Sequence, residues 1–400
     1  MNTSLQASEL MLKRGGAVDP AKFLDETFDL LSIPAFDKGE PEVVLGRKIG
    51  SSKKCVQPGD VLLSRIIPHI RRCWVVPVER GRRQIASGEW IIFRGNEFYP
   101  DYLKHYLVSD GFHKKFMSTV SGVGGSLLRA RPAEVERFEI PLPPFEEQRR
   151  IAAILDKADA IRRKRQRAIE LTETFLRSVF LDMFGDPVTN PKGWGTTTLD
   201  SACLKITDGT HHSPKTLDTG IPYITAKHLK SYGLDFESSP WFVSEEDHVP
   251  IYKRCDPVKG DVLYIKDGAT TGIAAINKYD FEFSMLSSLA LLRTDQNILL
   301  SEYLCDWLNN DRVKERVIRE VSGAAITRLT IRKIKDIRIE LPPIDLQNEY
   351  RSIRQSAYLS LEKERRIFRK LEKLFSSLIQ QAFKGELTQS TTPLKEAISA

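Results

Sequence analysis

Cysteine and long apolar runs are scarce in this sequence of 400 residues. The five cysteines form no CxxC pair and are odd in number, which fits reduced thiols in a cytoplasmic protein better than a disulfide framework or a zinc site. No stretch approaches the roughly 18 apolar residues of a membrane-spanning helix, and residues 1–12 contain no apolar run of signal-peptide length. We therefore expect a cytoplasmic protein that has no contact with a membrane.

Several signatures of catalysis are also absent. The sequence has no Gly-x-x-x-x-Gly-Lys-Ser/Thr loop for ATP and no glycine-rich strand-turn-helix for S-adenosylmethionine. Residues 142–145, Leu-Pro-Pro-Phe, resemble the Asn/Asp-Pro-Pro-Tyr/Phe motif of amino-methyltransferases, but Leu142 has no amide or carboxylate to hold an adenine amino group. We interpret this segment as a helix start, and the glycine-rich residues 121–126 as a flexible loop. The chain is expected to have no catalytic residues, no metal and no cofactor of its own.

Basic residues exceed acidic residues only moderately. The chain contains 60 Lys and Arg against 53 Asp and Glu, which gives a formal net charge of +7 and a pI of about 9.0. This balance suits a polyanionic partner, but many soluble proteins reach it without binding nucleic acid. With 41% hydrophobic residues, the chain is long enough for two domains that each have their own core.

The chain repeats itself once, at a distance of about 200 residues. Residues 59–62 (Gly-Asp-Val-Leu) recur at 260–263, residues 102–103 (Tyr-Leu) at 303–304, and residues 120–122 (Val-Ser-Gly) at 321–323, all in one register. With small shifts of register, residues 142–144 (Leu-Pro-Pro) match 341–343, Gln148 matches Gln347, and residues 53–55 match 253–255. A repeat of this length is too long for a solenoid and indicates the duplication of a domain.

Each repeat ends in a long segment without proline or glycine, at residues 145–184 and 344–383. Two prolines precede each segment, and proline suits the first turn of a helix. Apolar residues follow steps of three and four, which is the spacing of a coiled-coil seam. The expected seam consists of Ile151, Ile154, Ala158, Ile161, Ala168, Phe175 and Val179 in the first helix and of Ile353, Ala357, Leu361, Phe368, Leu371, Phe375, Leu378 and Ala382 in the second.

An amphipathic helix of this length needs a partner, and the simplest partner for each helix is the other. The globular segments contain short β-branched and aromatic runs typical of buried strands, such as residues 74–76, 90–93 and 290–292. We therefore predict an α+β fold with two duplicated mixed α/β domains, 1–143 and 186–342. They are separated by two long spacer helices, 144–185 and 343–388, which form an antiparallel coiled coil with pseudo-twofold symmetry. A flexible tail is expected at 389–400.

These duplicated motifs resemble the specificity subunit of type I restriction-modification systems. The resemblance covers nearly the whole chain and includes residues 207–214 (Thr-Asp-Gly-Thr-His-His-Ser-Pro) and 266–272 (Lys-Asp-Gly-Ala-Thr-Thr-Gly). The first domain departs from the pattern, because it has no clear copy of Asp-Gly-Thr-His and has Arg-Ile-Ile at 65–67 in place of Lys-Asp-Gly. This difference fits two domains that read different half-sites.

The resemblance implies a division of roles. Each globular domain would be a target recognition domain that reads one half of a split sequence in duplex DNA. The long helices would set the gap between the half-sites and dock two adenine methyltransferase subunits, to which ATP-dependent translocase and restriction subunits are added. S-adenosylmethionine, ATP and Mg would bind to these partner subunits. The chain itself is then expected to be a non-catalytic DNA-binding subunit.

Sequence-specific DNA binding needs cations for phosphates and forked or amide donors for base edges. The candidates in the first domain are Arg65, Arg71, Arg72, Arg82, Arg83, Arg129 and Arg131. The candidates in the second domain are His211, His212, Lys215, Lys227, His228, Lys266, Thr270, Thr271, Arg328 and Arg332.

Some of these candidates have a second interpretation. The small residues 268–272 beside Lys266 suit a backbone that approaches a phosphate closely, but an ordinary turn between strands explains them equally well. Neighbouring histidines on a strand point to opposite faces, so His211 and His212 are not expected to bind one metal together. They either face DNA or have a structural role.

Two other classes of function stay open as alternatives. A coiled-coil scaffold that joins two protein-binding domains would show the same duplication, and a steep salt dependence of binding to duplex DNA would distinguish DNA reading from it. A self-sufficient methyltransferase or nuclease is disfavoured by the missing catalytic motifs, and methyl transfer by the purified chain alone would reverse that judgement.

Overall fold

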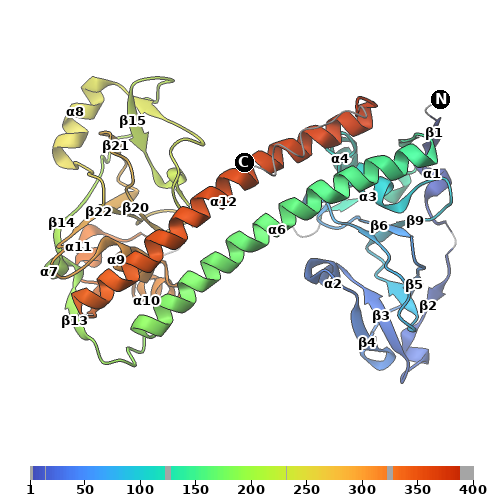
Figure 1. Ribbon diagram of the computed structural model, residues 1–400, viewed down its shortest axis with the longest axis horizontal. Helices are drawn as coiled ribbons and strands as arrows, with labels where there is room; N and C mark the ends of the chain where they lie inside the picture. Colours follow the sequence, from blue (N-terminus) through green and yellow to red (C-terminus); the bar gives the residue numbers. More distant parts are fainter. Residues whose placement is uncertain (1–2, 14, 122–127, 231, 322–327, 388–400) are drawn as a thin grey trace. The chain divides into compact units, whose positions relative to one another are not determined.

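A computed structural model describes residues 3–13, 15–121, 128–230, 232–321 and 328–387 (Figure 1). The chain divides into two compact units, of which unit 1 contains Met1–Arg167 and Arg365–Ala400 and unit 2 contains Ala168–Glu364. Each unit therefore holds one globular part and one half of each long helix. The predicted tail at 389–400 and residues 122–126 of the glycine-rich segment lie outside the described residues.

The described globular part of unit 1 is built around a three-stranded antiparallel sheet of order β7-β6-β9 and a five-stranded sheet of order β2-β5-β8-β3-β4. In the second sheet β3 and β8 run parallel. Two antiparallel pairs, β1 with β12 and β10 with β11, complete the strands. The strands are β1 (Thr3–Gln6), β2 (Ala17–Val18), β3 (Thr27–Leu31), β4 (Glu42–Leu45), β5 (Lys53–Cys55), β6 (Val61–Ser64), β7 (Cys73–Val75), β8 (Gln84–Ala86), β9 (Trp90–Phe93), β10 (Val120–Ser121), β11 (Arg129–Ala130) and β12 (Glu139–Leu142). The helices are α1 (Ala7–Leu10), η1 (Pro20–Lys22), α2 (Ile33–Lys38), η2 (Gly46–Lys48), η3 (Pro68–Ile70), α3 (Pro100–Val108), α4 (Asp110–Ser118) and α5 (Pro132–Val135).

The described globular part of unit 2 repeats the central sheet in a larger form. A four-stranded antiparallel sheet has the order β14-β22-β19-β20, and a three-stranded sheet has the order β18-β15-β21. The pairs β13 with β23 and β16 with β17 are antiparallel. The strands are β13 (Gly195–Thr198), β14 (Cys203–Asp208), β15 (Ile221–Ile224), β16 (Leu229–Lys230), β17 (Gly233–Leu234), β18 (Phe242–Val243), β19 (Val262–Ile265), β20 (Ala274–Ile276), β21 (Ser284–Met285), β22 (Leu289–Thr294) and β23 (Arg338–Leu341). The helices are α7 (Leu199–Ala202), η4 (Ala226–His228), α8 (Glu245–Arg254), α9 (Ser301–Asn309), α10 (Asp311–Val321) and α11 (Ile331–Lys335).

The repeated Gly-Asp-Val-Leu segment forms the start of the central strand in both units. Gly59 and Gly260 have φ values of 86° and 95°, a left-handed conformation that favours glycine. The next residue is a buried aspartate that accepts a bidentate pair of hydrogen bonds, from Arg94 to Asp60 at 2.7 and 2.6 Å and from Arg293 to Asp261 at 2.9 and 2.9 Å. The strands β6 and β19 that follow are fully buried, as their apolar sequence predicts. The duplication is thus confirmed in three dimensions and has the same chemistry in both copies.

The repeated glutamine fixes the start of each long helix to its globular part. In unit 1 the Gln148 side chain accepts from the Tyr99 amide at 2.8 Å and donates to the carbonyls of Glu97 and Pro143. In unit 2 the Gln347 side chain accepts from the amide of residue 300 at 2.9 Å and donates to the carbonyls of residues 298 and 342. The repeated tyrosine acts nearby, because Tyr102 and Tyr303 donate to the carbonyls of residues 141 and 340. The motifs that carry the resemblance therefore build the junction between domain and helix.

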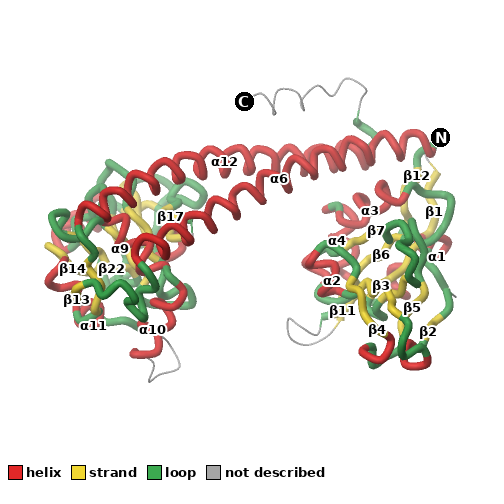
Figure 2. Tube along the Cα trace, turned by 60° about the horizontal axis from the view of Figure 1, so that its bottom comes forward, coloured by secondary structure: helices red, strands yellow, loops and turns green. Residues whose placement is uncertain are grey.

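The two long helices are α6 (Phe145–Phe184) and α12 (Ile344–Lys384), each continuous (Figure 2). In unit 1, Arg150 of α6 donates to the carbonyl of Leu387, just beyond the end of α12. In unit 2, Phe184 near the end of α6 packs on Tyr350 near the start of α12, with ring centroids 5.2 Å apart. The segments of the two helices are thus antiparallel within each unit, which confirms the prediction. Among the described residues, none of the helices combines the length and apolar character needed to cross a membrane.

The predicted seam agrees better with α12 than with α6. In α12, Leu361, Leu371, Leu378 and Ala382 are buried as expected, and the other four predicted residues are partly buried. In α6 the buried apolar residues are Ile151, Ala152, Leu155, Ala158, Ile169, Leu176, Phe180 and Phe184. Beyond Ala158 the seam continues at four- and three-residue steps through Arg162 and Arg165, which are only partly buried. Because two polar residues occupy seam positions, a seam predicted from apolar residues alone is displaced by one residue from the observed seam beyond Ala158.

Two apolar side chains of α6 are exposed instead of lying in the seam. Phe175, which the sequence predicts in the seam, is 52% exposed, and Leu171 one turn before it is 54% exposed. Both residues belong to unit 2. An exposed apolar pair on a helix surface is a feature of interaction sites.

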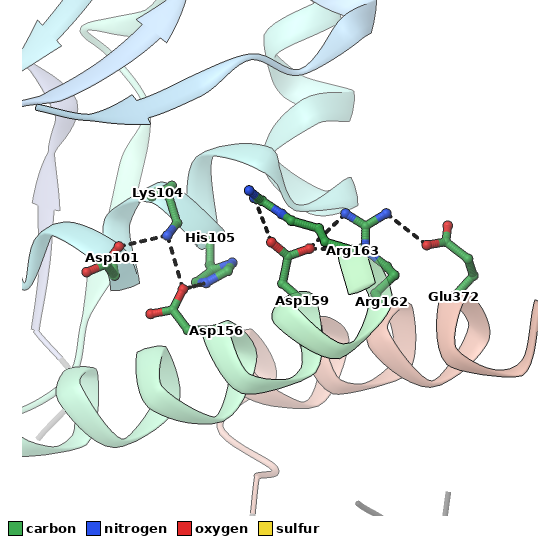
Figure 3. A network of polar contacts seen from close by, with 8 residues as sticks. All are labelled: Asp101, Lys104, His105, Asp156, Asp159, Arg162, Arg163 and Glu372. Atoms are coloured by element: carbon green, nitrogen blue, oxygen red, sulfur yellow. Dashed lines mark hydrogen bonds and ion pairs between the residues drawn. The ribbon is translucent and has the colours of Figure 1, made fainter. Parts of the chain in front are cut away.

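A polar network ties α6 to α3 and α12 in unit 1 (Figure 3). Asp156 of α6 accepts from Lys104 at 3.1 Å and lies 2.8 Å from the Nε2 atom of His105, both on α3. One turn on, Arg162 binds Asp159 of its own helix and Glu372 of α12 at 2.9 Å. Burial by itself raises the pKa of Asp156, but the His105 and Lys104 contacts outweigh it and lower the pKa below its usual value. The network therefore favours the ionised carboxylate.

Candidate nucleic-acid interface

The two sequence motifs special to the second domain meet in one cluster. Asp208 ends β14, and its carboxylate lies 3.3 Å from the Nζ atom of Lys266, which follows β19. Arg254, at the end of α8, donates to the same carboxylate at 2.7 Å, and the Nε2 atom of His211 lies 3.2 Å from it. Asp208 and Lys266 are 3% and 2% exposed, whereas Arg254 and His211 reach the surface. These four residues are named the Asp208 cluster.

Glycine and backbone pairing place the Asp208 cluster. A Cβ atom on Gly209 would lie 1.8 Å from the carbonyl oxygen of Met285, so only glycine lets the chain pass this point. Thr210 then pairs with Leu286 in a parallel bridge, and its hydroxyl accepts from the amide of His212 at 3.1 Å. The sequence Asp-Gly-Thr-His thus holds the carboxylate inside and turns the histidines outward.

The Asp208 carboxylate stays ionised because of its neighbours. Burial by itself raises the pKa of Asp208, but the hydrogen bond from Arg254 and the charges of Lys266 and His211 outweigh it and lower the pKa. One carboxylate thereby holds two cations and a histidine beside the ends of β14 and β19. Next to it, Arg328 lies 3.5 Å from Asp267 and is 59% exposed at its side chain.

Two of the arginines predicted in the first domain also share one carboxylate. Arg65 Nε lies 3.2 Å from Glu89, and Arg129 Nε and Nη2 each lie 3.3 Å from the same side chain. Burial raises the pKa of Glu89, but the hydrogen bonds and charges of Arg129 and Arg65 outweigh it, so the net shift is downward. The structure thus brings together Arg65 and Arg129, which are 64 positions apart in the sequence.

The other predicted arginines of the first domain are spread over the unit. Arg71 binds Asp110 at 2.6 Å, Arg82 binds the buried Asp29 at 2.6 Å, and Arg83 forms a bidentate pair with Glu26 and covers the Phe23 ring. Arg131 precedes α5 and is exposed. The side chains of Arg71, Arg82 and Arg83 are partly exposed at the surface.

Three predicted residues turn out to lie inside their domains. Arg72 is buried and forms a bidentate pair with Asp37 at 2.7 and 2.9 Å. His228 is fully buried and binds the amide of Thr225 and the carbonyl of Ser239. Lys266 is the buried member of the Asp208 cluster. Because these three side chains are largely withdrawn from the surface, we do not include them among direct DNA contacts.

The remaining candidates in the second domain lie at or near the surface. His212, Lys215, Thr270 and Arg332 are exposed, and Thr271 donates to the carbonyl of Gly268 at 2.7 Å within a turn. Lys227 lies over the ring of Trp241, 3.1 Å from its centroid, which is a cation-π contact. Arg254 was not among the predicted contacts, although its place in the repeated Lys-Lys/Arg-Cys segment was a signal that could have found it.

Comparison with known proteins identifies the family. Residues 91–173 and 191–382, well over half of the chain, match the family described as the type I restriction modification DNA specificity domain. The chain is 23% identical over 305 residues to the type I restriction enzyme MjaIX specificity subunit of Methanocaldococcus jannaschii, which covers 72% of this chain and 69% of that protein. It is also 23% identical over 315 residues to the type I restriction enzyme StySPI specificity subunit of Salmonella potsdam. This match covers 72% of this chain and 66% of that protein.

A solved structure shares the fold. The type I restriction-modification system S subunit from M. genitalium matches 96% of this chain and 96% of its own chain with a TM-score of 0.59, at 14% sequence identity. The duplicated sheet, the glutamine junctions and the family match agree with the resemblance found in the sequence. The chain therefore belongs to the family of type I restriction-modification DNA specificity subunits.

Proposed function

We propose that this protein reads a split sequence in duplex DNA, with one globular part on each half-site, and performs no catalysis itself. The observation that carries the proposal is the duplication of one architecture, in which a globular part with a basic cluster is fixed by a glutamine junction to the start of a long helix. Basic side chains held at a surface suit the phosphates of DNA. Two copies of such a surface suit two half-sites.

The chemistry in this proposal belongs to partner subunits. Two adenine methyltransferase subunits would dock on the long helices and bind S-adenosylmethionine, and added translocase and restriction subunits would bind ATP and Mg. The complex would act in the cytoplasm, where its DNA is found. In support, the names of the relatives place them in type I restriction enzymes as specificity subunits.

Co-purification from the native host tests the function directly. We expect the tagged chain to retain an adenine methyltransferase, and methylation sequencing of the host DNA to show a split target that disappears when the gene is deleted. Recovery of unrelated proteins, together with unchanged methylation, would favour a scaffold that joins two protein-binding domains. Methyl transfer by the purified chain alone would contradict the non-catalytic role.

Lengthening both helices is expected to lengthen the gap between half-sites. One heptad inserted into both α6 and α12 keeps the seam in phase and adds about 10 Å of helix, or about three base pairs of DNA. The methylated sequence should keep its two half-sites and change only their separation, which methylation sequencing would reveal. A heptad inserted into α6 alone serves as the control that breaks the pairing. An unchanged gap in the double insertion would refute the role of the helices as a spacer.

The exposed pair on α6 is a candidate docking surface for a methyltransferase subunit. Replacing Leu171 and Phe175 by glutamate should weaken assembly with the methyltransferase by about tenfold or more, because both side chains would lose their burial in the interface. DNA-independent assembly can be measured by titration calorimetry. Leu204→Glu, at an exposed leucine on β14 of the same unit, is the control and should leave assembly unchanged. Normal assembly of the double variant would place the docking surface elsewhere.

A further inference from the structure

The first domain lacks the Asp-Gly-Thr-His segment, yet it contains a counterpart of the Asp208 cluster. Arg65 and Arg129 contact the Glu89 carboxylate, and Lys54 bonds the main chain of the next residue, Trp90; Lys54, Arg65, Arg129 and Glu89 are named the Glu89 cluster. The carboxylate comes from the turn before β9, whereas Asp208 comes from the end of β14. The same arrangement of charges is therefore built from different parts of the chain.

Backbone hydrogen bonds show that the two clusters occupy equivalent places. The amide of Arg65 donates to the Glu89 carbonyl, and the Arg65 carbonyl accepts from the amide of Ala130. In unit 2 the amide of Lys266 donates to the carbonyl of residue 288, and its carbonyl accepts from the amide of residue 329. Isolated bridges join residue 66 to Arg129 and residue 267 to residue 328. Arg65 thus corresponds to Lys266, and Arg129 to Arg328.

The third cation corresponds in sequence, although Lys54 lies on β5 and Arg254 ends α8. Lys54 and Arg254 occupy matching positions in the repeated segments at 53–55 and 253–255. Lys54 donates to the carbonyl of Trp90 at 3.0 Å, beside Glu89. Burial and, to a lesser degree, the charge of Arg65 lower the pKa of Lys54, while Glu89 raises it.

The Glu89 cluster keeps positive charge at the surface. Two arginines share one carboxylate, and their side chains, Arg65 and Arg129, are 35% and 42% exposed. Each guanidinium carries five N–H donors, more than one shared carboxylate can accept from two arginines. Glu89 therefore orients the two guanidinium groups and leaves some of their N–H donors for a second anion.

We propose that the Glu89 cluster is the DNA-phosphate site of the first domain, equivalent to the site that the Asp208 cluster and Arg328 form in the second. The inference rests on the proposed function and deepens it. Arg65 and Arg129 contact a backbone phosphate, and Glu89 is a positioning residue that holds both guanidinium groups in place. Such contacts position the domain on DNA without reading its sequence.

Salt dependence of binding by the complete complex with the methyltransferase subunits tests the site. For Arg65→Gln/Arg129→Gln, we expect affinity for target DNA to fall about tenfold or more, and the slope of log affinity against log salt to become shallower by about 1–2. Non-target DNA should be affected to a similar degree. Arg65→Lys/Arg129→Lys keeps both cations and should retain most of the slope.

Arg47→Gln/Arg137→Gln is the matched control, because it removes the same charge from two exposed arginines of unit 1. Thermal unfolding and assembly with the methyltransferase verify that each variant is folded. An unchanged slope in the glutamine variant, an equal change in the control, or an equal loss in the lysine variant would overturn the inference. If the unaltered complex does not bind a specific sequence, the proposed function fails instead.

Discussion

Replacement of Asp306 by alanine is expected to lower the free energy of unfolding by about 3–5 kcal/mol. Arg354 of α12 is only 6% exposed, and Asp306 of α9 accepts from its Nε and Nη2 atoms at 2.6 and 3.0 Å. The Tyr350 hydroxyl donates to the same carboxylate. Burial lowers the pKa of Arg354, but Asp306 raises it by more, so the guanidinium stays charged. Without Asp306 a buried charge loses its partner.

Urea unfolding with a probe in unit 2 measures this effect. The double variant Asp306→Leu/Arg354→Leu removes both charges and should recover most of the loss, since apolar residues often replace a buried ion pair at little cost. Asp280→Ala, in an exposed pair with Lys259 of the same unit, is the matched control and should cost less than about 1 kcal/mol. A small effect of Asp306→Ala would show that water reaches Arg354.

Asp208→Asn is expected to destabilise unit 2 by about 3 kcal/mol or more at neutral pH, because the buried Lys266 loses its charged partner. The folded-state pKa of Asp208 lies below the ordinary aspartate value of 3.8, so its ionised form contributes stability that is fully present above that value. This contribution is lost as the pH falls through the folded-state pKa. The difference between the variant and the unaltered protein should therefore shrink below about pH 4.

Chemical unfolding at a series of pH values measures this difference. Asp280→Asn removes an exposed carboxylate paired with Lys259 in the same unit and is the control. It should have little effect at any pH. A difference for Asp208→Asn that persists unchanged at low pH would contradict the assignment of the stabilisation to the ionised carboxylate.

The sequence predicted the architecture better than the surface chemistry. The duplication, the helices and the buried strands could be predicted, because repeated motifs and apolar spacing are visible directly in the sequence. The seam of α6 was missed beyond Ala158 because Arg162 occupies a seam position, where its charge is compensated by Asp159 and Glu372. Apolar periodicity carries no information about such compensation.

The DNA candidates were chosen by residue type, and folding decides which of them can act together. Arg82 and Arg83 find Asp29 and Glu26 because β3 and β8 pair in parallel, although more than 50 residues separate the partners. Arg72 is enclosed for a similar reason, through Asp37. The grouping of Arg65 and Arg129 around Glu89 could not be predicted either, since Glu89 does not belong to the Asp-Gly-Thr-His motif that marks the second domain.

The glutamine junction has a consequence for how such proteins change. Every hydrogen bond of Gln148 and Gln347 goes to a main-chain atom of the globular part or of the proline segment before the helix. The side chains at the contact differ between the copies, with Glu97 and Tyr99 in one and Ile298 and Leu300 in the other. A junction that depends only on the path of the backbone is compatible with any domain whose chain follows that path. A globular domain with a different surface can therefore replace the present one on the same helices without changes to the junction.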